Sequence, residues 1–147
     1  MFEITLRTKV ALEAINVMSE NKNFIVGVGT LMTDDNIQNA INVGAKFGIS
    51  PGISEELFEG CEKNNFPLIP GVSTPSEVMV SYNRGYKVLK FFPATVLGGI
   101  EMLKALEGPF PDCCFFPTGG INQNNFKTYL SLSNVYGAVS YTHLRAH

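Results

Sequence analysis

The stretch VLKFFPATVLGG at residues 88–99 reads as one structural unit: a short apolar run, a proline, and two glycines that open a helix-like segment. Short apolar runs bounded by Gly and Pro are typical of buried strands. Lys90 lies inside this run, although lysine is among the residues least often fully buried. The stretch therefore predicts a buried strand that leads into a helix and carries one lysine.

The same strand-and-helix unit repeats along the chain. The apolar runs begin about 20–26 residues apart, the spacing of a strand, a short helix and two turns. This alternation predicts an α/β fold of parallel strands joined by right-handed crossovers. A small (β/α) barrel is the preferred architecture, and an open doubly wound sheet is the alternative. The seven runs are FEITLRT (2–8), FIVGVGT (24–30), KFGISPG (46–52), PLIPGVST (67–74), VLKFFPA (88–94), CFFPTGG (114–120) and VYGAVS (135–140).

The segments between these runs have helical periodicity. Thr33, Ser54 and Ser76 are predicted N-caps, because acidic residues follow them in the first turn, where the helix dipole favours negative charge. The predicted helical segments are residues 9–21, 33–45, 54–65, 76–85, 98–108 and 122–134.

Composition excludes several classes of function. The 147 residues are 45% hydrophobic and 16% charged, with a net charge of −2 and no basic run, which fits one globular domain and argues against nucleic-acid or anionic-membrane partners. No apolar stretch reaches the roughly 18–20 residues that span a bilayer, and no signal peptide is visible. Three cysteines without framework spacing favour a reducing cytoplasm.

Histidine is nearly absent, which narrows the possible chemistry. The two histidines, His143 and His147, both lie in the last five residues, so catalysis elsewhere would use carboxylates, lysine, tyrosine or thiols rather than histidine. The segment GVGTLM at residues 27–32 lacks the third glycine of a dinucleotide-binding fingerprint, so Rossmann-type binding is not expected.

Two strands place polar side chains where a barrel interior would be. Side chains alternate along a strand, so Glu3 and Arg7 share one face of the first run, and Lys90 shares a face with Phe92. The alternative is that both strands turn these faces to water. A lysine that burial desolvates shifts toward the neutral amine, which can form a Schiff base with a carbonyl. With a carboxylate to move protons and a guanidinium to hold a carboxylate, the set predicts aldol chemistry on a 2-keto acid.

FPTGGIN at residues 116–122 is a second candidate site. A strand that runs into Thr-Gly-Gly and then into a helix offers backbone N–H groups that can hold an anion. Phosphate sites in (β/α) barrels often lie after the seventh and eighth strands, which is where this segment falls if one strand is missing upstream. An ordinary tight turn is the alternative.

In this order and spacing, EITLRT, VGVGT, ISPG, PLIPGVST, KFFPA and FPTGGI closely resemble the 2-dehydro-3-deoxyphosphogluconate (KDPG) aldolases over residues 2 to about 139. The resemblance implies a (β/α)8 barrel and a class I aldolase without metal or cofactor, usually a cytoplasmic homotrimer. Its substrate would be the phosphorylated keto-deoxy sugar acid, split into pyruvate and glyceraldehyde 3-phosphate. Alternative substrates are the galactonate analogue and 4-hydroxy-2-oxoglutarate, which pocket residues outside these motifs would decide.

The resemblance also implies a role for each matching residue. Lys90 would form the Schiff base and Glu3 would be the general acid and base. Arg7 and Thr30 would hold the pyruvate carboxylate, and Pro51 would shape the pocket. Thr118 would contact the aldehyde part of the substrate, and Gly119 and Gly120 would bind its phosphate.

The chain departs from the family pattern at both ends. The family's first strand and helix and its C-terminal helices are missing, and Ser140, Tyr141 and Thr142 stand where the family has a Gly-Gly-Ser phosphate loop. These features predict a partial barrel of about seven strands over residues 1–139, followed by a non-native or frame-shifted tail over 140–147. An inactive phosphate-binding barrel fragment is the alternative to an enzyme.

Overall fold

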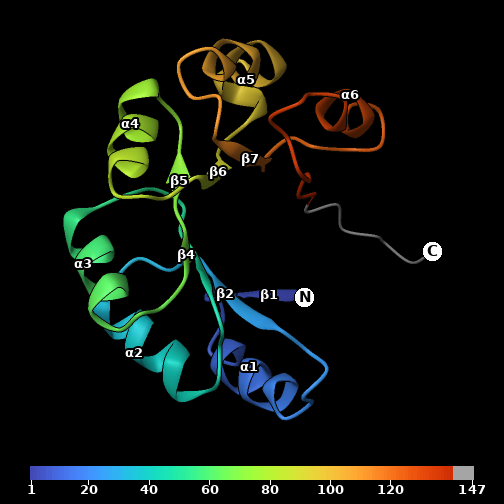
Figure 1. The fold of residues 1–147 in the computed structure, drawn as a ribbon. Coiled ribbons are helices and arrows are strands. Elements are labelled where there is room, and N and C mark those ends of the chain that lie inside the picture. Colours follow the sequence, from blue (N-terminus) through green and yellow to red (C-terminus); the bar gives the residue numbers. More distant parts are fainter. Residues whose placement is uncertain (141–147) are drawn as a thin grey trace. The chain divides into compact units, whose positions relative to one another are not determined.

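The computed structural model describes residues 1–140, so the predicted tail over residues 140–147 lies outside them except for Ser140. The chain divides into two compact units, the first comprising Met1–Gly71 and the second beginning at Val72. In each unit, short strands alternate with helices along the chain (Figure 1).

The first unit is built on a four-stranded parallel sheet in the order β1-β2-β3-β4. Helix α1 packs against β1 and β2, while α2 and α3 pack on each other. The strand order follows the chain order, as the alternating pattern predicts. The elements are β1 (Phe2–Thr5), α1 (Ala11–Ser19), β2 (Val26–Gly29), α2 (Asp34–Asn42), β3 (Gly48–Ile49), α3 (Glu55–Lys63) and β4 (Leu68–Ile69).

Two predicted N-caps are confirmed in this unit. The Thr33 hydroxyl accepts a hydrogen bond from Asn36 N at 3.2 Å, and Ser54 Oγ accepts one from Leu57 N at 3.2 Å. Each bond satisfies an N–H group that the first turn of a helix leaves without a partner. The two caps therefore fix where α2 and α3 begin, directly after the loops that leave β2 and β3.

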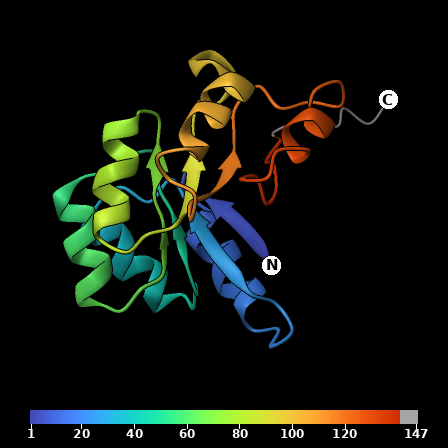
Figure 2. The same cartoon turned by 45° about the horizontal axis from the view of Figure 1, so that its top comes forward.

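The second unit contains a three-stranded sheet in the order β5-β6-β7. Strands β6 and β7, yellow and orange in Figure 2, run parallel and side by side. None of the helices in residues 1–140 is long and apolar enough to cross a membrane. The elements are β5 (Gly71–Val72), α4 (Pro75–Asn83), β6 (Val88–Phe91), the 3-10 turn η1 (Thr95–Leu97), α5 (Gly99–Glu107), β7 (Cys114–Pro117) and α6 (Phe126–Leu130).

The predicted cap of α4 is wrong by two residues. The N-cap is Thr74 rather than Ser76, because Pro75 occupies the first helical position, where its missing N–H costs nothing. Thr74 and Glu77 form a capping box: Thr74 Oγ1 accepts from Glu77 N at 3.3 Å, and Glu77 Oε2 accepts from Thr74 N at 2.9 Å. Ser73 adds two further bonds to the same carboxylate oxygen, each 2.7 Å long.

Replacing Glu77 with alanine is expected to lower the free energy of unfolding by about 1 kcal/mol at neutral pH. Burial alone would raise the pKa of Glu77. The hydrogen bonds from Ser73 and Thr74 lower the pKa by more than burial raises it, so the pKa of Glu77 is below its usual value of 4.5. The stabilisation is therefore present above pH 4.5 and is lost as the pH falls through the lower folded-state value. Urea unfolding from neutral to acidic pH measures this; Glu59→Ala, on an exposed position of α3, is the control. A pH-independent difference would contradict the assignment.

The last predicted strand does not form. Of residues 135–140, only Val135 and Val139 make isolated bridges, to Phe115 and Thr118 of the second unit. These bridges, with hydrogen bonds from Tyr136 N to Phe115 O and from Val139 N to Pro117 O, bring the segment alongside β7 without forming a continuous strand. The fourth predicted run, residues 67–74, is also interrupted, since β4 ends before Pro70 and β5 begins after it.

Candidate functional site

Lys90 is a buried residue in the middle of β6. Its exposed fraction is 6%, while Leu89 and Phe91 on the other face of the strand are fully buried. The Lys90 ammonium nitrogen lies 4.8 Å from the ring centroid of Phe92, two residues further along the same face. The amine is thus held within an apolar strand, as the sequence predicts.

Thr118 follows β7 and lies on the same sheet face as Lys90. Lys90 is paired with Phe116, and residues in register on parallel strands project to the same side. Thr118 lies two residues after Phe116, so its side chain projects to the same side of the sheet, closer to the carboxyl ends of the strands. Its N–H donates to Phe91 O of β6 at 2.9 Å and its exposed fraction is 2%, so this hydrogen bond ties Thr118 to β6. Lys90 and Thr118 are the two predicted site residues that the second unit places on one surface.

Gly119 and Gly120 both adopt the left-handed backbone region, with φ of 98° and 79°. The prediction that a helix starts directly after them is wrong. Helix α6 begins at Phe126, and a turn separates it from the glycines. In this turn, Asn125 Nδ2 donates to Gly120 O at 2.9 Å. Any anion held here would therefore be bound by the N–H groups of the loop rather than by a helix terminus.

Glu3 lies over β2, which presents only glycines, Gly27 and Gly29, on the face toward the Glu3 side chain. It is paired with Gly27 of β2, and its carboxyl group extends over Gly29, where a Cβ atom would overlap with it. On the same face the ring of Phe47 occupies the space beside Gly27. The two glycines of the VGVG strand thus make room for two side chains from the neighbouring segments, one acidic and one aromatic.

Gly29→Ala is expected to lower the aldol activity that the sequence predicts about tenfold, with little change in stability, because a methyl group would displace the end of the flexible Glu3 side chain. Gly27→Ala is the matched control: its methyl group would meet the Phe47 ring, which is buried and cannot yield, at a cost of about 1–3 kcal/mol. Initial rates and thermal unfolding of both variants measure the two effects. Equal effects of the two substitutions on rate and stability would contradict this division of roles.

Thr30 directly follows β2 and has a positive φ of 59°, which β-branched residues rarely adopt. Val28 N bonds to Phe47 O, so a regular parallel ladder would next pair residue 30 with Ile49 O. Instead, Leu31 N bonds to Ile49 O at 3.1 Å, and Thr30 is an extra residue in the strand. Such a conformation costs on the order of 1–3 kcal/mol and is typical of functional sites.

Arg7 lies outside β1, which ends at Thr5. It is an exposed residue of the turn after the strand, where its N–H donates to Thr5 O at 2.8 Å. The alternation that places Glu3 on its face therefore does not determine where the Arg7 side chain points. The turn still holds Arg7 at the carboxyl end of β1, on the edge of the unit where Thr30 also lies.

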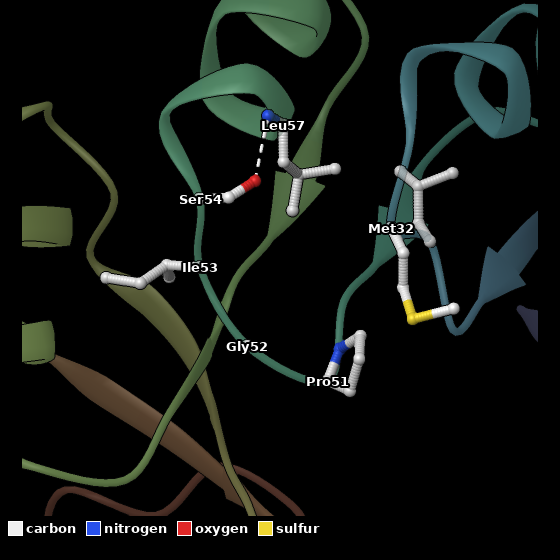
Figure 3. A pocket seen from close by; sticks show the side chains of 7 residues that line it. Met32, Pro51, Gly52, Ile53, Ser54 and Leu57 are labelled. Atoms are coloured by element: carbon white, nitrogen blue, oxygen red, sulfur yellow. Dashed lines mark hydrogen bonds between the residues drawn. The ribbon is translucent and has the colours of Figure 1, made fainter.

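Pro51 lines a pocket of about 200 Å³ between the loops that follow β2 and β3 (Figure 3). Its lining is mostly apolar and carries no charged side chain, with Leu31, Met32, Ile53 and Leu57 as the larger members. Sequence reasoning identified Pro51 but missed these four residues. Their closeness in sequence to Thr30 and Pro51 was the only available signal. The pocket suits an uncharged group rather than a phosphate.

The thiol groups of the chain are held in their protonated form. Burial, with smaller contributions from Glu62 and Asp34, raises the pKa of Cys61 to about 11. Burial also raises the pKa of Cys113 and Cys114 above the usual value. Because the thiolate is the nucleophile, none of the three is activated. Among residues 1–140 no group of three or more His, Cys, Asp and Glu side chains is arranged to hold a metal ion.

The predicted site residues thus form two groups. One lies in the first unit, at or near the carboxyl ends of its strands, and the other lies in the second unit on and after β6 and β7. In parallel α/β folds these ends are where ligands bind. The first group is Glu3, Arg7, Thr30 and Pro51, and the second is Lys90, Thr118, Gly119 and Gly120.

Known proteins match nearly the whole chain. The family profile described as KDPG and KHG aldolase matches residues 1–145. The KHG/KDPG aldolase of Escherichia coli strain K12 is 43% identical over 136 residues, which are 92% of this chain and 64% of that protein. The chain therefore spans a little under two thirds of the length of this curated relative.

Two crystal structures give the same result for the fold. The KDPG aldolase of Legionella pneumophila, with pyruvate captured as a covalent carbinolamine intermediate, is 45% identical with a TM-score of 0.88, over 92% of this chain and 68% of that chain. The aldolase of Zymomonas mobilis ZM4, with 3-phosphoglycerate, is 35% identical with a TM-score of 0.89, over 95% and 67%. The predicted α/β fold of the (β/α)8 barrel type is confirmed, and the chain belongs to the KDPG and KHG aldolase family.

Proposed function

We propose that this chain is part of a class I aldolase that cleaves 2-dehydro-3-deoxy-6-phosphogluconate into pyruvate and glyceraldehyde 3-phosphate. The observation that carries the proposal is the buried amine of Lys90, 6% exposed on a strand face that it shares with Thr118. The Legionella relative, which holds pyruvate as a covalent carbinolamine, supports the same chemistry for this chain.

The reaction begins when the neutral amine of Lys90 attacks the C2 carbonyl of the substrate. The resulting carbinolamine loses water and becomes an iminium ion, which attracts electrons from the neighbouring carbon. A base removes the proton of the C4 hydroxyl, the C3–C4 bond breaks, and its electron pair forms an enamine while the aldehyde leaves. Protonation at C3 and addition of water then release pyruvate and the free amine. Glu3 is the group proposed to carry these protons.

The remaining residues hold the two ends of the substrate. Arg7 and Thr30 would bind the carboxylate next to the reacting carbonyl, since a guanidinium donates parallel hydrogen bonds to a carboxylate. The loop of Gly119 and Gly120 would bind the phosphate through its backbone N–H groups. Fixing both ends brings C2 to the amine, which converts a bimolecular attack into an intramolecular one.

Cleavage of 4-hydroxy-2-oxoglutarate is a second candidate activity, because the E. coli relative is named for both substrates. This substrate has a carboxylate where the sugar acid carries its phosphate-bearing chain, while the pyruvate half is the same. Lys90 and Glu3 would therefore serve both reactions. The ratio of kcat/KM for the two substrates would reflect only the contacts at the far end.

A coupled assay of pyruvate release tests the proposal. The chain should release pyruvate from the phosphorylated sugar acid at a rate that a chelator leaves unchanged. Borohydride should abolish that rate when pyruvate is present and have little effect without it, because it reduces only the imine. Loss of activity on chelation, or inactivation by borohydride that does not depend on pyruvate, would refute the Schiff-base mechanism.

We also propose a homotrimer in the cytoplasm as the state of the whole protein. Support comes from the resemblance to the family and from three free cysteines, which fit a reducing compartment. Light scattering of the whole protein tests the trimer. A monomeric mass at micromolar concentration would contradict it.

A further inference from the structure

We propose that Thr95 is a positioning residue that orients the N–H groups of the Gly119–Gly120 loop toward the phosphate of the substrate. The inference rests on the proposed function for the identity of its ligand. Thr95 opens η1, directly after Ala94 in the loop that leaves β6. It contacts the glycine loop through its backbone, its hydroxyl group and its methyl group.

The loop after β6 is bonded to the loop after β7 by consecutive residues. Ala94 N donates to Thr118 O at 2.8 Å, and Thr95 N donates to Gly119 O at 3.1 Å. Thr95 Oγ1 donates to the same Gly119 carbonyl, also at 3.1 Å. Gly119 O therefore accepts two hydrogen bonds from one residue, which fixes the direction of that carbonyl.

A fixed carbonyl also fixes the N–H group of the next residue. The peptide unit is planar and trans, so the C=O of one residue and the N–H of the next point in opposite directions. Consecutive carbonyls of an extended strand point to opposite sides, but the positive φ of Gly119 turns the chain. Thr118 O and Gly119 O consequently both face the 94–95 segment. The N–H groups of Gly119 and Gly120 therefore both point away from it and together form a concave anion-binding arrangement.

These two N–H groups are not used by the fold. Among residues 1–140, neither one donates a hydrogen bond to a protein atom. Next to them, Asn125 Nδ2 donates to Gly120 O at 2.9 Å, which fixes the following peptide unit in the same way. All three carbonyls from Thr118 to Gly120 are thus occupied.

The Thr95 side chain also fills the space above Gly120. A Cβ atom at Gly120 would overlap with Thr95 Oγ1 and Cβ, so the glycine and the threonine are in close contact. The hydroxyl group of Tyr129 lies 3.5 Å from Thr95 Oγ1, and Tyr129 is only 3% exposed. Helix α6 therefore also contacts the Thr95 hydroxyl group, although the Thr95 residue is itself exposed.

Thr95→Val keeps the shape of the side chain and removes only its hydroxyl donor. We expect it to raise the KM for the phosphorylated substrate by about three- to tenfold, the value of one neutral hydrogen bond, and to leave kcat unchanged. Exchange of the pyruvate methyl protons should be unaffected, because pyruvate carries no phosphate. Thr95→Ser should restore the KM, and Thr128→Val, on an exposed position of α6, is the control.

Binding of inorganic phosphate, measured by the shift in melting temperature or by 31P NMR, provides a readout that needs no aldolase activity. Thr95→Val should weaken phosphate binding by the same factor as the KM. If phosphate binding depends on Thr95 while the chain releases no pyruvate, the proposed function fails and this inference stands. Unchanged phosphate affinity in Thr95→Val, no phosphate binding by the parent chain, or an equal loss in pyruvate exchange would overturn the inference.

Discussion

Lys90→Met is expected to abolish pyruvate release, with a fall in kcat/KM of about 10³-fold or more. Methionine fills a similar volume but has no amine, so neither the carbinolamine nor the iminium ion can form. Steady-state rates measure the loss, and thermal unfolding of the same preparation checks that the variant is folded.

Lys87→Met is the matched control for this variant. Lys87 precedes β6, is exposed, and pairs with Asp112 at 3.2 Å on the surface. A surface pair contributes about 0–1 kcal/mol, so this variant should lose little stability and no activity. Retention of a tenth or more of the parent activity by Lys90→Met, or an equal loss in both variants, would show that the Lys90 amine is not the nucleophile.

Glu3→Gln is expected to slow exchange of the pyruvate methyl protons by about 10²-fold or more. The amide has the shape of the carboxyl group and fits the same space over Gly29, but it cannot accept and return a proton. The Schiff base itself should still form, more slowly, since Lys90 is intact. NMR in deuterated water follows the exchange directly.

Glu13→Gln, an exposed position on α1, controls for the loss of one negative charge. If Glu3→Gln exchanges protons at the parent rate, another group carries the proton and the proposed role of Glu3 is wrong. If the variant forms no reduced pyruvate adduct at all, Glu3 is needed for formation of the Schiff base as well as for the later proton transfer.

The sequence predicts the fold well where its signal is periodic. Lys90 is identified as buried because its neighbours are apolar on both sides, and the structure confirms this. The caps at Thr33 and Ser54 are correct because one hydroxyl precedes each acidic turn. At residues 73–76, by contrast, Ser, Thr and Ser all qualify by type. Thr74 is the N-cap because Pro75, which favours the first position of a helix, follows it directly. A search that looks only for acidic residues in the first turn overlooks this effect.

Predictions that depend on chain direction after a strand are less successful. Two positive φ angles after Thr118 turn the chain into an Asn-rich loop, and α6 starts only at Phe126. Arg7 falls outside its strand because β1 ends at Thr5. Thr95 was not identified at all, since a threonine in a turn has no distinctive pattern. Its proposed role follows only from its two hydrogen bonds to the Gly119 carbonyl.

Reduction of the pyruvate complex with borohydride, followed by peptide mass mapping, tests the central claim most directly. We predict that one reduced pyruvate adduct forms and that it lies on the peptide that contains Lys90, with unmodified Lys87 as the internal comparison. Folded protein that yields no adduct, or an adduct on another lysine, would contradict the proposal that the buried amine of β6 captures the substrate carbonyl.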